Sequence, residues 1–570
     1  MVEAGAGTGK TKAATSWVAG LLEEGIPGES IMMITFTRKA AAEMKHRVKQ
    51  LAGSLADTVI CGTYHHVALR MIRRNPEAFG YSGAMTILDD PDCKLLVKEA
   101  YKSLGIKSPE ISAAEIISAI SSARNRDVDI GNFLRSRYSD ETRVVDVAKI
   151  YLEQKKENHL LDYDDILISL RDRLVASPSY ATSVRNRFTH LLVDEMQDNN
   201  IVQYQILQAI NPHHLMVVGD INQSIYGFRA AEPGLMIRFI EENADAEKIR
   251  LETNYRSGNR ILELANRIIA DGPSPLVLKS GTGRDARVEI REYQDVMEEA
   301  GIIAGKIEDL IEAGQQPATI GVLARSSRTL APLEINLRRS GIEYRKYGGI
   351  SVADALEVRD FTSFVRVMAN PLDKPSWMRV LTQFPGVGVT SARKAIESTF
   401  VLDALPKKAA VLKDWMREAE SLPFHEGLRS LMGNVRTMMW ENYEDNNAQS
   451  RMDNLERLVE SCISEDFTRE DFVDAFVTEK MEEKHPELAI TLSTIHSAKG
   501  LEWETVFLVG AGDTQMPGRR AIERHEIEEE RRLMYVAVTR AKGNLGISFP
   551  GVLGEGWYGG DAQGVSRFLQ

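Results

Sequence analysis

Four short apolar runs in the first third of the chain each end in polar residues. They are SIMMITFT (30–37), DTVICGTYH (57–65), HLLVDE (190–195) and HLMVVGD (214–220). Near-continuous apolar runs of this length are typical of parallel strands that are buried on both faces, with functional residues at their carboxyl ends. The pattern predicts an α/β domain built around a parallel sheet.

A second set of apolar runs predicts a second α/β domain later in the chain. Its expected strands are RVEIREY (from 287), TIGVLARS (319–326), IEYRKYGG (342–349), AITLSTIH (489–496), TVFLVGAG (505–512) and NLGISF (544–549). Two longer stretches, at about 91–160 and 379–486, instead show helical periodicity with polar loops. We therefore expect two α/β cores, each interrupted by a mainly helical insertion.

The length of the chain agrees with this division, because 570 residues exceed what one hydrophobic core supports. The boundaries that we predict are 1–90 and 161–258 for the first α/β domain, 91–160 for its insertion, 259–378 and 487–570 for the second α/β domain, and 379–486 for its insertion.

Composition narrows the class of protein by exclusion. The net charge of −12 argues against a protein that coats nucleic acid through a uniformly basic surface, but it is compatible with one local basic groove. The three cysteines have no metal-ligand spacing, and no apolar run approaches the roughly 20 residues that span a bilayer. The N-terminus lacks the order of regions found in a signal peptide. We expect a cytoplasmic protein without a membrane segment.

The stretch AGAGTGKT (4–11) predicts a phosphate-binding loop. Its glycines let backbone N–H groups turn inward around phosphate oxygens, and the following helix directs its positive end at the anion. Lys10 is expected to reach the β and γ phosphates, and Thr11 to ligate Mg²⁺. The alternative is a glycine-rich turn with a solvated lysine. The nucleotide-binding residues that we predict here are Ala4, Gly5, Ala6, Gly7, Thr8, Gly9, Lys10 and Thr11.

Two adjacent carboxylates end the predicted strand in HLLVDEMQD (190–198). Asp194 is expected to hold Mg²⁺, and Glu195 to polarise the water that attacks the γ phosphate. The competing interpretation is a solvated acidic strand end, and the phosphate loop in the same chain argues against it.

The next strand leads into VVGDINQSIYGFRAAE (217–232), where polar and aromatic residues alternate. Gln223 is placed to sense the γ phosphate. Tyr226 and Phe228, followed by Arg229, suit base stacking on single-stranded nucleic acid. The alternative is that both rings belong to the hydrophobic core.

Two further segments, LETNYRSGNRIL (251–262) and EEERRLMYVAVTRAK (528–542), carry arginines next to apolar helical faces. Arg256 and Arg540 are candidates for stabilising charge on the transferred phosphoryl group. Tyr255 is expected to stack on adenine. For any one of these arginines the alternative is a surface ion pair.

These motifs belong to an ordered series that covers nearly the whole chain. The series is AGAGTGKT, TFTRKAAAEM (35–44), GTYHH (62–66), LDYDDIL (161–167), LLVDEMQD, VGDINQSIYGFRA, NYRS (254–257), STIHSAKGLEW (493–503) and RRLMYVAVTRA (531–541). In its content and order it resembles superfamily 1 DNA helicases of the UvrD/Rep/PcrA family. The resemblance implies two RecA-like P-loop motor domains with an ATP site between them.

The resemblance also assigns residues to the ATP site. The positions Lys10, Thr11, Asp194, Glu195 and Gln223 match those that the family's first motor domain contributes. By the same match, Tyr255 stacks on the adenine and Arg256 contributes charge, Glu502 holds the ribose, and Arg540 is the arginine finger. The implied cofactors are ATP and Mg²⁺.

For DNA, the resemblance implies a single strand that runs across both motor domains, with movement 3′ to 5′. The matching positions are Phe36, Thr63, His65, Tyr226, Phe228, Arg229 and His496. The segment FPGVGVTSARKAI (384–396), with Gly386 and Gly388, resembles a turn that contacts the duplex backbone. Single-stranded DNA and junctions with duplex are therefore the expected partners.

Several positions depart from the family pattern. Phe228 stands where well-known members have tryptophan, and Arg38 stands where asparagine is commoner. The insertion at 379–486 looks shorter than usual, which puts its grip on duplex in doubt. The family's Q-motif glutamine, which reads adenine before the phosphate loop, has no counterpart here. We expect either a translation start further upstream or weaker discrimination among nucleotides.

Three hypotheses follow from the sequence. The first is an ATP-dependent 3′–5′ DNA helicase for repair, replication or recombination, encoded by a bacterium or a phage and acting as a monomer or weak dimer. The second is a translocase that strips proteins from single strands but unwinds poorly. The third is a DNA-binding subunit with weak ATP turnover, against which the full set of catalytic side chains speaks.

Overall fold

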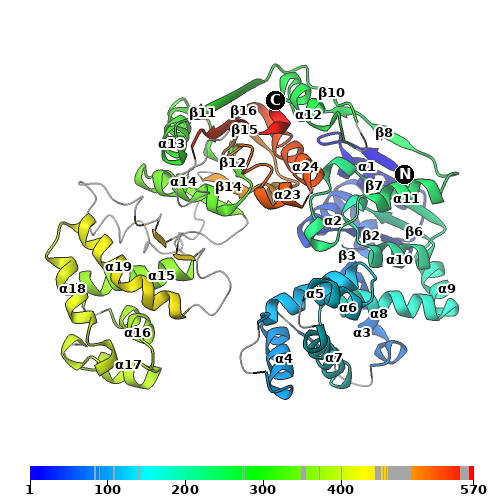
Figure 1. Cartoon of the computed structure of the whole chain (residues 1–570). Helices are drawn as coiled ribbons and strands as arrows, with labels where there is room; N and C mark the ends of the chain where they lie inside the picture. Colours follow the sequence, from blue (N-terminus) through cyan, green and yellow to red (C-terminus); the bar gives the residue numbers. More distant parts are fainter. Residues whose placement is uncertain are drawn as a thin grey trace. The chain divides into compact units, whose positions relative to one another are not determined.

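The computed structural model describes two compact units. The described residues are 1–81, 85–88, 90–106, 110–138, 141–272, 274, 276–347, 355–371, 373–398, 401–442, 451–452, 455–456, 459, 489–524, 526–552 and 564–570. The first unit comprises Met1–Arg284 and Glu528–Thr539, and the second comprises Asp285–Ile527 and Arg540–Gln570 (Figure 1).

A six-stranded parallel sheet forms the centre of the first unit, in the order β3-β2-β6-β7-β1-β8. Its strands are β1 (Val2–Ala4), β2 (Ile31–Thr35), β3 (Ile60–Thr63), β6 (His190–Val193), β7 (His214–Gly219) and β8 (Ile249–Leu251). The four strands predicted for this part of the chain are confirmed. The short β1 lies between β7 and β8, with Val2 opposite both Val218 and Ile249.

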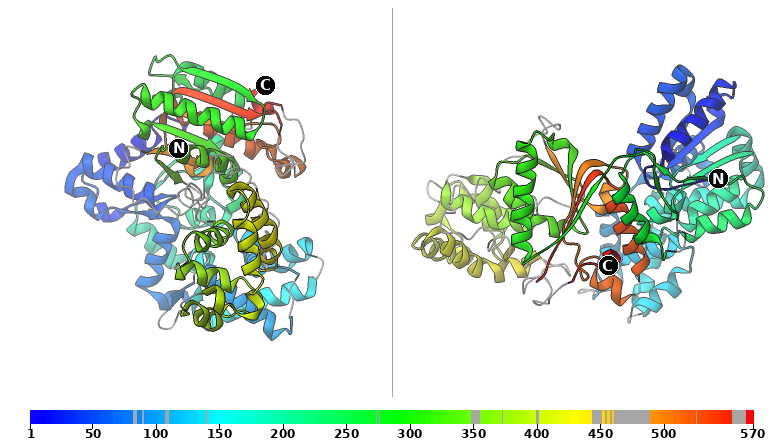
Figure 2. Two further views of the ribbon diagram at one scale, coloured as in Figure 1. Left: turned by 90° about the vertical axis from the view of Figure 1, so that its left-hand side faces the viewer. Right: turned by 90° about the horizontal axis from the view of Figure 1, so that it is seen from above.

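Helices cover both faces of this sheet because successive strand residues point to opposite sides. Ile31 and Met33 pack with α1 (Lys10–Glu23) and α2 (Arg38–Ala52). Met32 and Ile34 pack into the core of the other face. That face is covered by α3 (Tyr64–Arg74), α8 (Tyr163–Ala176), α9 (Pro178–Arg187), α10 (Ile201–Ile210) and α11 (Gly234–Glu242) (Figure 2).

The first predicted helical insertion has a hydrophobic core of its own. It contains α4 (Asp90–Ser103), α5 (Ala113–Asn125), α6 (Ile130–Arg137) and α7 (Glu141–Glu157), packed around buried residues such as Val97, Ile120 and Tyr151. The chain enters and leaves it side by side, because β4 (Thr86–Ile87) pairs with β5 (Leu160–Leu161).

Buried charges join this insertion to α8. The Lys155 Nζ, on a residue only 2% exposed, lies 2.7 Å from the Asp165 Oδ2, and Arg124 contacts the other oxygen of the same carboxylate at 2.6 Å. Because removing one partner would leave an uncompensated buried charge, the network fixes how the helices meet α8.

The second unit contains another six-stranded parallel sheet, in the order β11-β16-β15-β12-β14-β13. The strands are β11 (Arg287–Tyr293), β12 (Ile320–Ala324), β13 (Tyr344–Tyr347), β14 (Ile490–Thr494), β15 (Trp503–Leu508) and β16 (Ala541–Pro550). Buried side chains of α13 (Val296–Glu312) and α14 (Ser327–Arg339) pack on one face of it. The predicted two-sheet α/β fold is confirmed.

A separate helical core in this unit comprises α15 (Leu356–Ala369), α16 (Lys374–Thr382), α17 (Val389–Ile396), α18 (Leu412–Glu420) and α19 (Phe424–Asn442). The core already includes Phe361 of α15, before the predicted start of the insertion at 379. Most of residues 443–488, including the predicted polar loop, lie outside the described residues. The finer division of each unit into two domains therefore stays a prediction.

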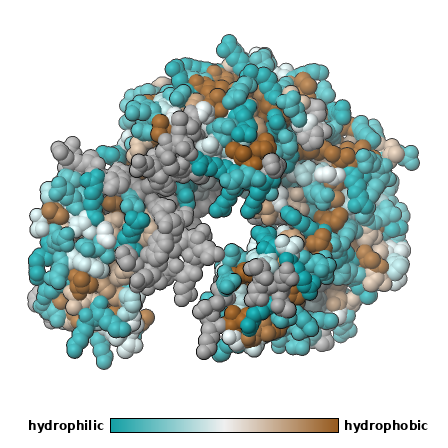
Figure 3. Space-filling view, in the orientation of Figure 1, coloured by the Kyte–Doolittle hydropathy of each residue, from teal (hydrophilic) through white to brown (hydrophobic). Residues whose placement is uncertain are grey.

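The remaining α-helices and strands of the described residues are β9 (Thr253–Asn254), β10 (Lys279–Ser280), α12 (Asn259–Ile269), α22 (Ile495–Ala498), α23 (Arg519–Glu523) and α24 (Ile527–Val538). α12 and nearly all of α24 pack in the first unit, although the sequence assigned both to the second domain. Among the described helices none is long and apolar enough to cross a membrane. The visible surface is largely hydrophilic, with apolar residues in small separate groups (Figure 3).

Candidate nucleotide site and strand-binding residues

The predicted phosphate loop connects β1 to α1 in a conformation that requires glycine. Gly7 and Gly9 have φ angles of +67° and +90°, which L side chains rarely adopt. Thr8 Oγ1 donates a hydrogen bond to the Gly5 carbonyl at 2.9 Å and closes the turn. Gly9 precedes α1 and supplies no side-chain cap, so the first N–H groups of the helix are available to an anion.

Lys10 carries a buried ammonium group at the start of α1. Its Nζ forms no hydrogen bond with the described residues. Burial raises the pKa of Asp220, and the positive charge of Lys10 opposes that shift. A buried ammonium with unused donors suits a phosphate ligand, so the loop and Lys10 fit the triphosphate of ATP.

Asn254 fixes the loop from the neighbouring segment. Its side-chain N–H donates to the Ala6 carbonyl at 2.6 Å, and its Oδ1 accepts the Arg256 N–H at 2.8 Å. The Tyr255 N–H donates to the Gly7 carbonyl at 2.9 Å. A Cβ added at Gly7 would lie only 2.6 Å from Asn254 Nδ2, so glycine is needed there for packing as well as for its φ angle. Sequence reasoning singled out NYRS but missed this role of Asn254.

α24 reaches the same loop from the far end of the chain. The Ala6 N–H points to the Tyr535 hydroxyl oxygen at 3.4 Å, and Arg256 donates to the Thr539 carbonyl at 3.1 Å. Tyr255 is 66% exposed, so its ring is accessible to a ligand. Tyr535 was not predicted, since nothing in its local sequence distinguishes it from other core aromatics.

The two predicted carboxylates follow β6. Asp194 is 6% exposed, and its N–H donates to the Ile34 carbonyl of the adjacent strand at 2.9 Å. Glu195 adopts φ +56°, an uncommon value for a residue with a side chain and one that clusters at active sites. Its carboxylate accepts a hydrogen bond from the Gln197 side-chain amide.

Gln197 connects this carboxylate to the next strand end. It is fully buried, and its Oε1 accepts the Asp220 N–H at 2.9 Å. Its main-chain carbonyl accepts the Ser224 hydroxyl at 2.9 Å. Gln223 donates to Asp220 Oδ2 at 2.5 Å. Gln197 is a residue that sequence reasoning missed, because a buried glutamine is distinguished only by its partners.

α24 also holds the segment after β7. Arg532 Nε donates to the Ser224 carbonyl at 2.6 Å, and the Gly227 N–H donates to Glu529 Oε1 at 3.2 Å. Burial lowers the pKa of Arg532, with Glu529 acting against that shift. The segment from 224 to 227 is therefore fixed from both ends.

The predicted strand-binding aromatics gather at the carboxyl ends of β2 and β7. The Phe36 and Tyr226 rings stack with centroids 4.6 Å apart and an interplanar angle of 23°. Tyr226 meets Phe228 edge-on at 5.9 Å, and Phe228 is 67% exposed. The exposure of Phe228 does not fit the alternative in which both rings are core. The side chain of Arg229 lies outside the described residues.

Thr63 and His65 lie where β3 meets α3. Thr63 is the N-cap of α3, and its Oγ1 accepts the His66 N–H at 3.2 Å. The His65 ring packs edge-on against Tyr163, which is 53% exposed, with centroids 5.9 Å apart. Both predicted residues thus lie at the carboxyl edge of the first sheet.

The other predicted residues belong to the second unit. Arg540 is 1% exposed and donates to the Leu501 carbonyl at 3.2 Å, while Glu502 pairs with Lys542 at 2.9 Å. These two therefore lie together at the start of β15. His496 is in α22, and Gly386 (φ +78°) and Gly388 precede α17.

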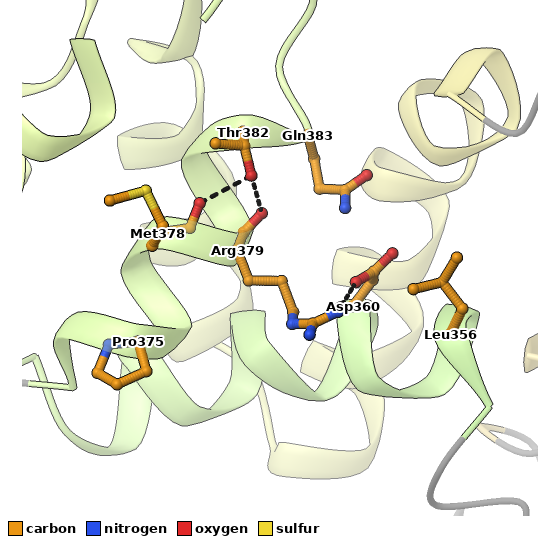
Figure 4. A pocket seen from close by; sticks show the side chains of 7 residues that line it. All are labelled: Leu356, Asp360, Pro375, Met378, Arg379, Thr382 and Gln383. Atoms are coloured by element: carbon orange, nitrogen blue, oxygen red, sulfur yellow. Dashed lines mark hydrogen bonds and ion pairs between the residues drawn. The ribbon is translucent and has the colours of Figure 1, made fainter. Parts of the chain in front are cut away.

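A pocket of about 560 Å³ lies between α15 and α16, in the helical part of the second unit. Its lining residues are Leu356, Asp360, Pro375, Met378, Arg379, Thr382 and Gln383 (Figure 4). Arg379 spans it to Asp360 at 2.6 Å, so its main charges neutralise each other. None of the residues predicted for ATP or DNA lines it.

Comparison with known proteins covers almost the whole chain. Residues 1–244 match the family model of the UvrD/REP helicase N-terminal domain, and residues 249–421 and 424–550 match the UvrD-like helicase C-terminal domain. The ATP-dependent DNA helicase PcrA of Staphylococcus epidermidis is 30% identical over 96% of this chain and 81% of its own. PcrA of Bacillus subtilis is 31% identical over 96% of this chain and 80% of its own. This chain belongs to the UvrD/REP helicase family.

Proposed function

We propose that this chain is an ATP-dependent DNA helicase that moves 3′ to 5′ along single-stranded DNA and acts at junctions with duplex. One observation carries the proposal most strongly. Gln197 contacts the Glu195 carboxylate and, through its carbonyl, Ser224 of the segment that bears Tyr226. Residues placed for hydrolysis and residues placed for base stacking therefore share one continuous hydrogen-bonded structure.

The roles in hydrolysis follow from charge and position. Lys10 and the backbone N–H groups of the loop bind the phosphates, and Tyr255 stacks on the base. Glu195 orients the attacking water and accepts its proton, while Gln223 contacts the γ phosphate. Arg256 and Arg540 stabilise the charge that develops on the transferred group, and Glu502 holds the ribose.

The hydroxyl of Thr11 and the carboxylate of Asp194 are hard oxygen donors of the kind that Mg²⁺ prefers. Thr11 lies in the first turn of α1, and Asp194 directly follows β6. Both elements belong to the first unit. The ion would neutralise charge on the β and γ phosphates.

On the DNA side, the stacked rings provide sequence-tolerant contacts, since every base has a π face. Phe36, Tyr226 and Phe228 are the aromatic contacts, and Thr63, His65, Arg229 and His496 line the rest of the strand path. Gly386 and Gly388 allow the backbone before α17 to approach duplex phosphates. The two relatives named above are bacterial, which supports a bacterial or phage origin. We further propose that the protein acts in the cytoplasm as a monomer or weak dimer.

The first experiment measures ATP hydrolysis with and without single-stranded DNA. We expect strong stimulation by DNA, and loss of turnover in Lys10→Ala and in Glu195→Gln. Hydrolysis that does not respond to DNA would overturn the motor function, and absence of turnover in the wild type would favour the DNA-binding subunit.

The second experiment separates the helicase from a translocase that only strips proteins from a strand. Displacement of a complementary strand from 3′-tailed and 5′-tailed duplexes is compared with displacement of streptavidin from a biotinylated end. The proposed helicase unwinds the 3′-tailed duplex. Streptavidin release without unwinding would favour the translocase.

A further inference from the structure

Four exposed arginines gather at the ends of two helices in the first unit, and we name them the α3–α9 arginine cluster. Arg70, Arg73 and Arg74 occupy the last turns of α3, and Arg187 is the last residue of α9. Spacings of three and four residues place the first three on neighbouring positions of the helix surface. None of the four forms a hydrogen bond or an ion pair with another residue that the structure describes.

Packing at the helix ends brings these charges together. Phe188, the residue after Arg187, is buried in the same hydrophobic cluster as Val67 and Ile72 of α3. The Arg187 guanidinium rests 5.2 Å from the centre of the Phe188 ring, which restricts its movement. Partial burial, followed by the like charges of Arg74 and Arg70, lowers the pKa of Arg187. The shared packing thus places Arg187 near enough to Arg70 and Arg74 for their like charges to repel.

A purely structural role does not account for the cluster. Cations near the end of a helix interact favourably with its dipole, and this explains one arginine per helix end. The helix dipole does not explain four arginines that have no carboxylate partner among the described residues. The chain offers many such partners, with 82 acidic and 70 basic residues. Around Glu289 the same chain gathers Arg287, Arg291 and Lys306 at 3.6, 2.5 and 3.7 Å from one carboxylate. A cluster that lacks such a counter-charge is suited to an external polyanion.

We propose that the α3–α9 arginine cluster binds the phosphate backbone of DNA, outside the strand path formed by the aromatic residues. The position of the cluster, close to the proposed strand path, supports DNA as the ligand. α3 begins at Tyr64, between Thr63 and His65 of the proposed path, and Arg74 lies about 14 Å beyond His65 along the helix at 1.5 Å per residue. Guanidinium forks match phosphate oxygens, and such contacts carry no sequence information. The choice of DNA as the polyanion rests on the proposed function.

The test compares two variants of the full chain that lose equal charge. The first is Arg70→Gln with Arg74→Gln and Arg187→Gln. The matched control is Arg287→Gln with Arg291→Gln and Lys306→Gln, which removes three cations that already surround Glu289. Circular dichroism and hydrolysis of ATP without DNA are measured first, and both variants are expected to match the wild type because all six side chains lie outside the proposed catalytic site.

Equilibrium binding is then measured from about 50 to 200 mM KCl, the range in which phosphate contacts dominate the salt dependence. The ligands are a single strand of about 8 nucleotides, which fills the aromatic path alone, a strand of about 40 nucleotides, and a 3′-tailed duplex. For the cluster variant we expect unchanged binding of the short strand. On at least one longer ligand, the slope of log affinity against log salt should fall by about 2 to 3, one phosphate contact per arginine.

Equal salt slopes for the cluster variant and the control on both longer ligands would overturn the inference. An equal fall of the salt slope on the short strand and on the longer ligands would also overturn the inference, because the cluster would then belong to the strand path itself. If the wild type fails to bind the short strand, the proposed function fails instead, so the two failures are distinguishable.

Discussion

The side-chain amide of Gln197 donates a hydrogen bond to the carboxylate of Glu195, and its own oxygen accepts the backbone N–H of Asp220. The residue proposed as general base is thus held by a neighbour that is anchored on the adjacent strand end. A base whose direction is fixed before substrate binds loses less of its reactivity to misalignment.

Replacement of Gln197 by leucine is expected to lower kcat for ATP by about 10- to 100-fold, because a misdirected base loses part of its contribution. The dissociation constant of a non-hydrolysable ATP analogue should stay near the wild-type value. Gln208→Leu is the control, since among the described residues the Gln208 side chain donates to the exposed Glu242 alone. Equal effects of the two substitutions would contradict a positioning role.

Asn254→Ala removes the donor to the Ala6 carbonyl and the acceptor of the Arg256 and Ser257 N–H groups, so these backbone groups lose their partner. We expect the free energy of unfolding to fall by about 1–3 kcal/mol, with weaker nucleotide binding. Denaturant unfolding and analogue titration measure the two effects. Asn243→Ala, which loses a hydrogen bond to Phe239 at a helix end, is the control and should leave nucleotide affinity unchanged.

Phe228→Ala separates a stacking ring from a core ring. Because the side chain is 67% exposed, its removal should change the free energy of unfolding by no more than about 0.5 kcal/mol. Affinity for single-stranded DNA should weaken by about 1–3 kcal/mol, the usual worth of one base stacked on an aromatic ring. Leu55→Ala, at an exposed apolar residue of similar exposure (53%), is the control. A large loss of stability with unchanged DNA affinity would support the core alternative.

His190 gives the first unit a dependence on pH. Its ring stacks on His214 with centroids 4.4 Å apart, and burial, then the neighbouring histidine, lowers its pKa. A histidine with a lowered pKa in the folded state binds fewer protons than in the unfolded state. Stability from this group is therefore complete above the unfolded pKa of about 6.5 and is lost as the pH falls.

We expect the free energy of unfolding to decrease between pH 7 and pH 5, and to decrease less in His190→Asn. The exposed His46→Asn is the control and should keep the wild-type slope. Identical slopes for the wild type and His190→Asn would exclude this contribution.

The strands and their end residues could be predicted because their information is local. A run such as HLLVDE is apolar along the buried strand and acidic where the strand ends. In the structure, the buried strand β6 is followed directly by Asp194. Gly7 and Gly9 likewise indicate positive backbone φ angles, which other residues rarely adopt. Both α/β cores and the clustering of the candidate residues at strand ends followed from such patterns.

The supporting residues could not be predicted in the same way. The partners of the supporting residues are backbone groups, often remote in sequence, as for Asn254, Gln197 and Tyr535. An amide or phenol side chain does not by itself indicate which group it will contact. The membership of α24 in the first unit depends on contacts across more than half the chain. Arg532 near Ser224, 308 positions away, is one example.

The contact between Ala6 and Tyr535 also sets an order of events during synthesis. Ala6 of the glycine loop leaves the ribosome 529 residues before Tyr535 of α24, which supports the loop. A growing chain therefore holds its glycine loop without the Tyr535 hydroxyl and without the Thr539 carbonyl that receives Arg256. The loop therefore reaches its complete set of described contacts only after α24 and Thr539 have been translated.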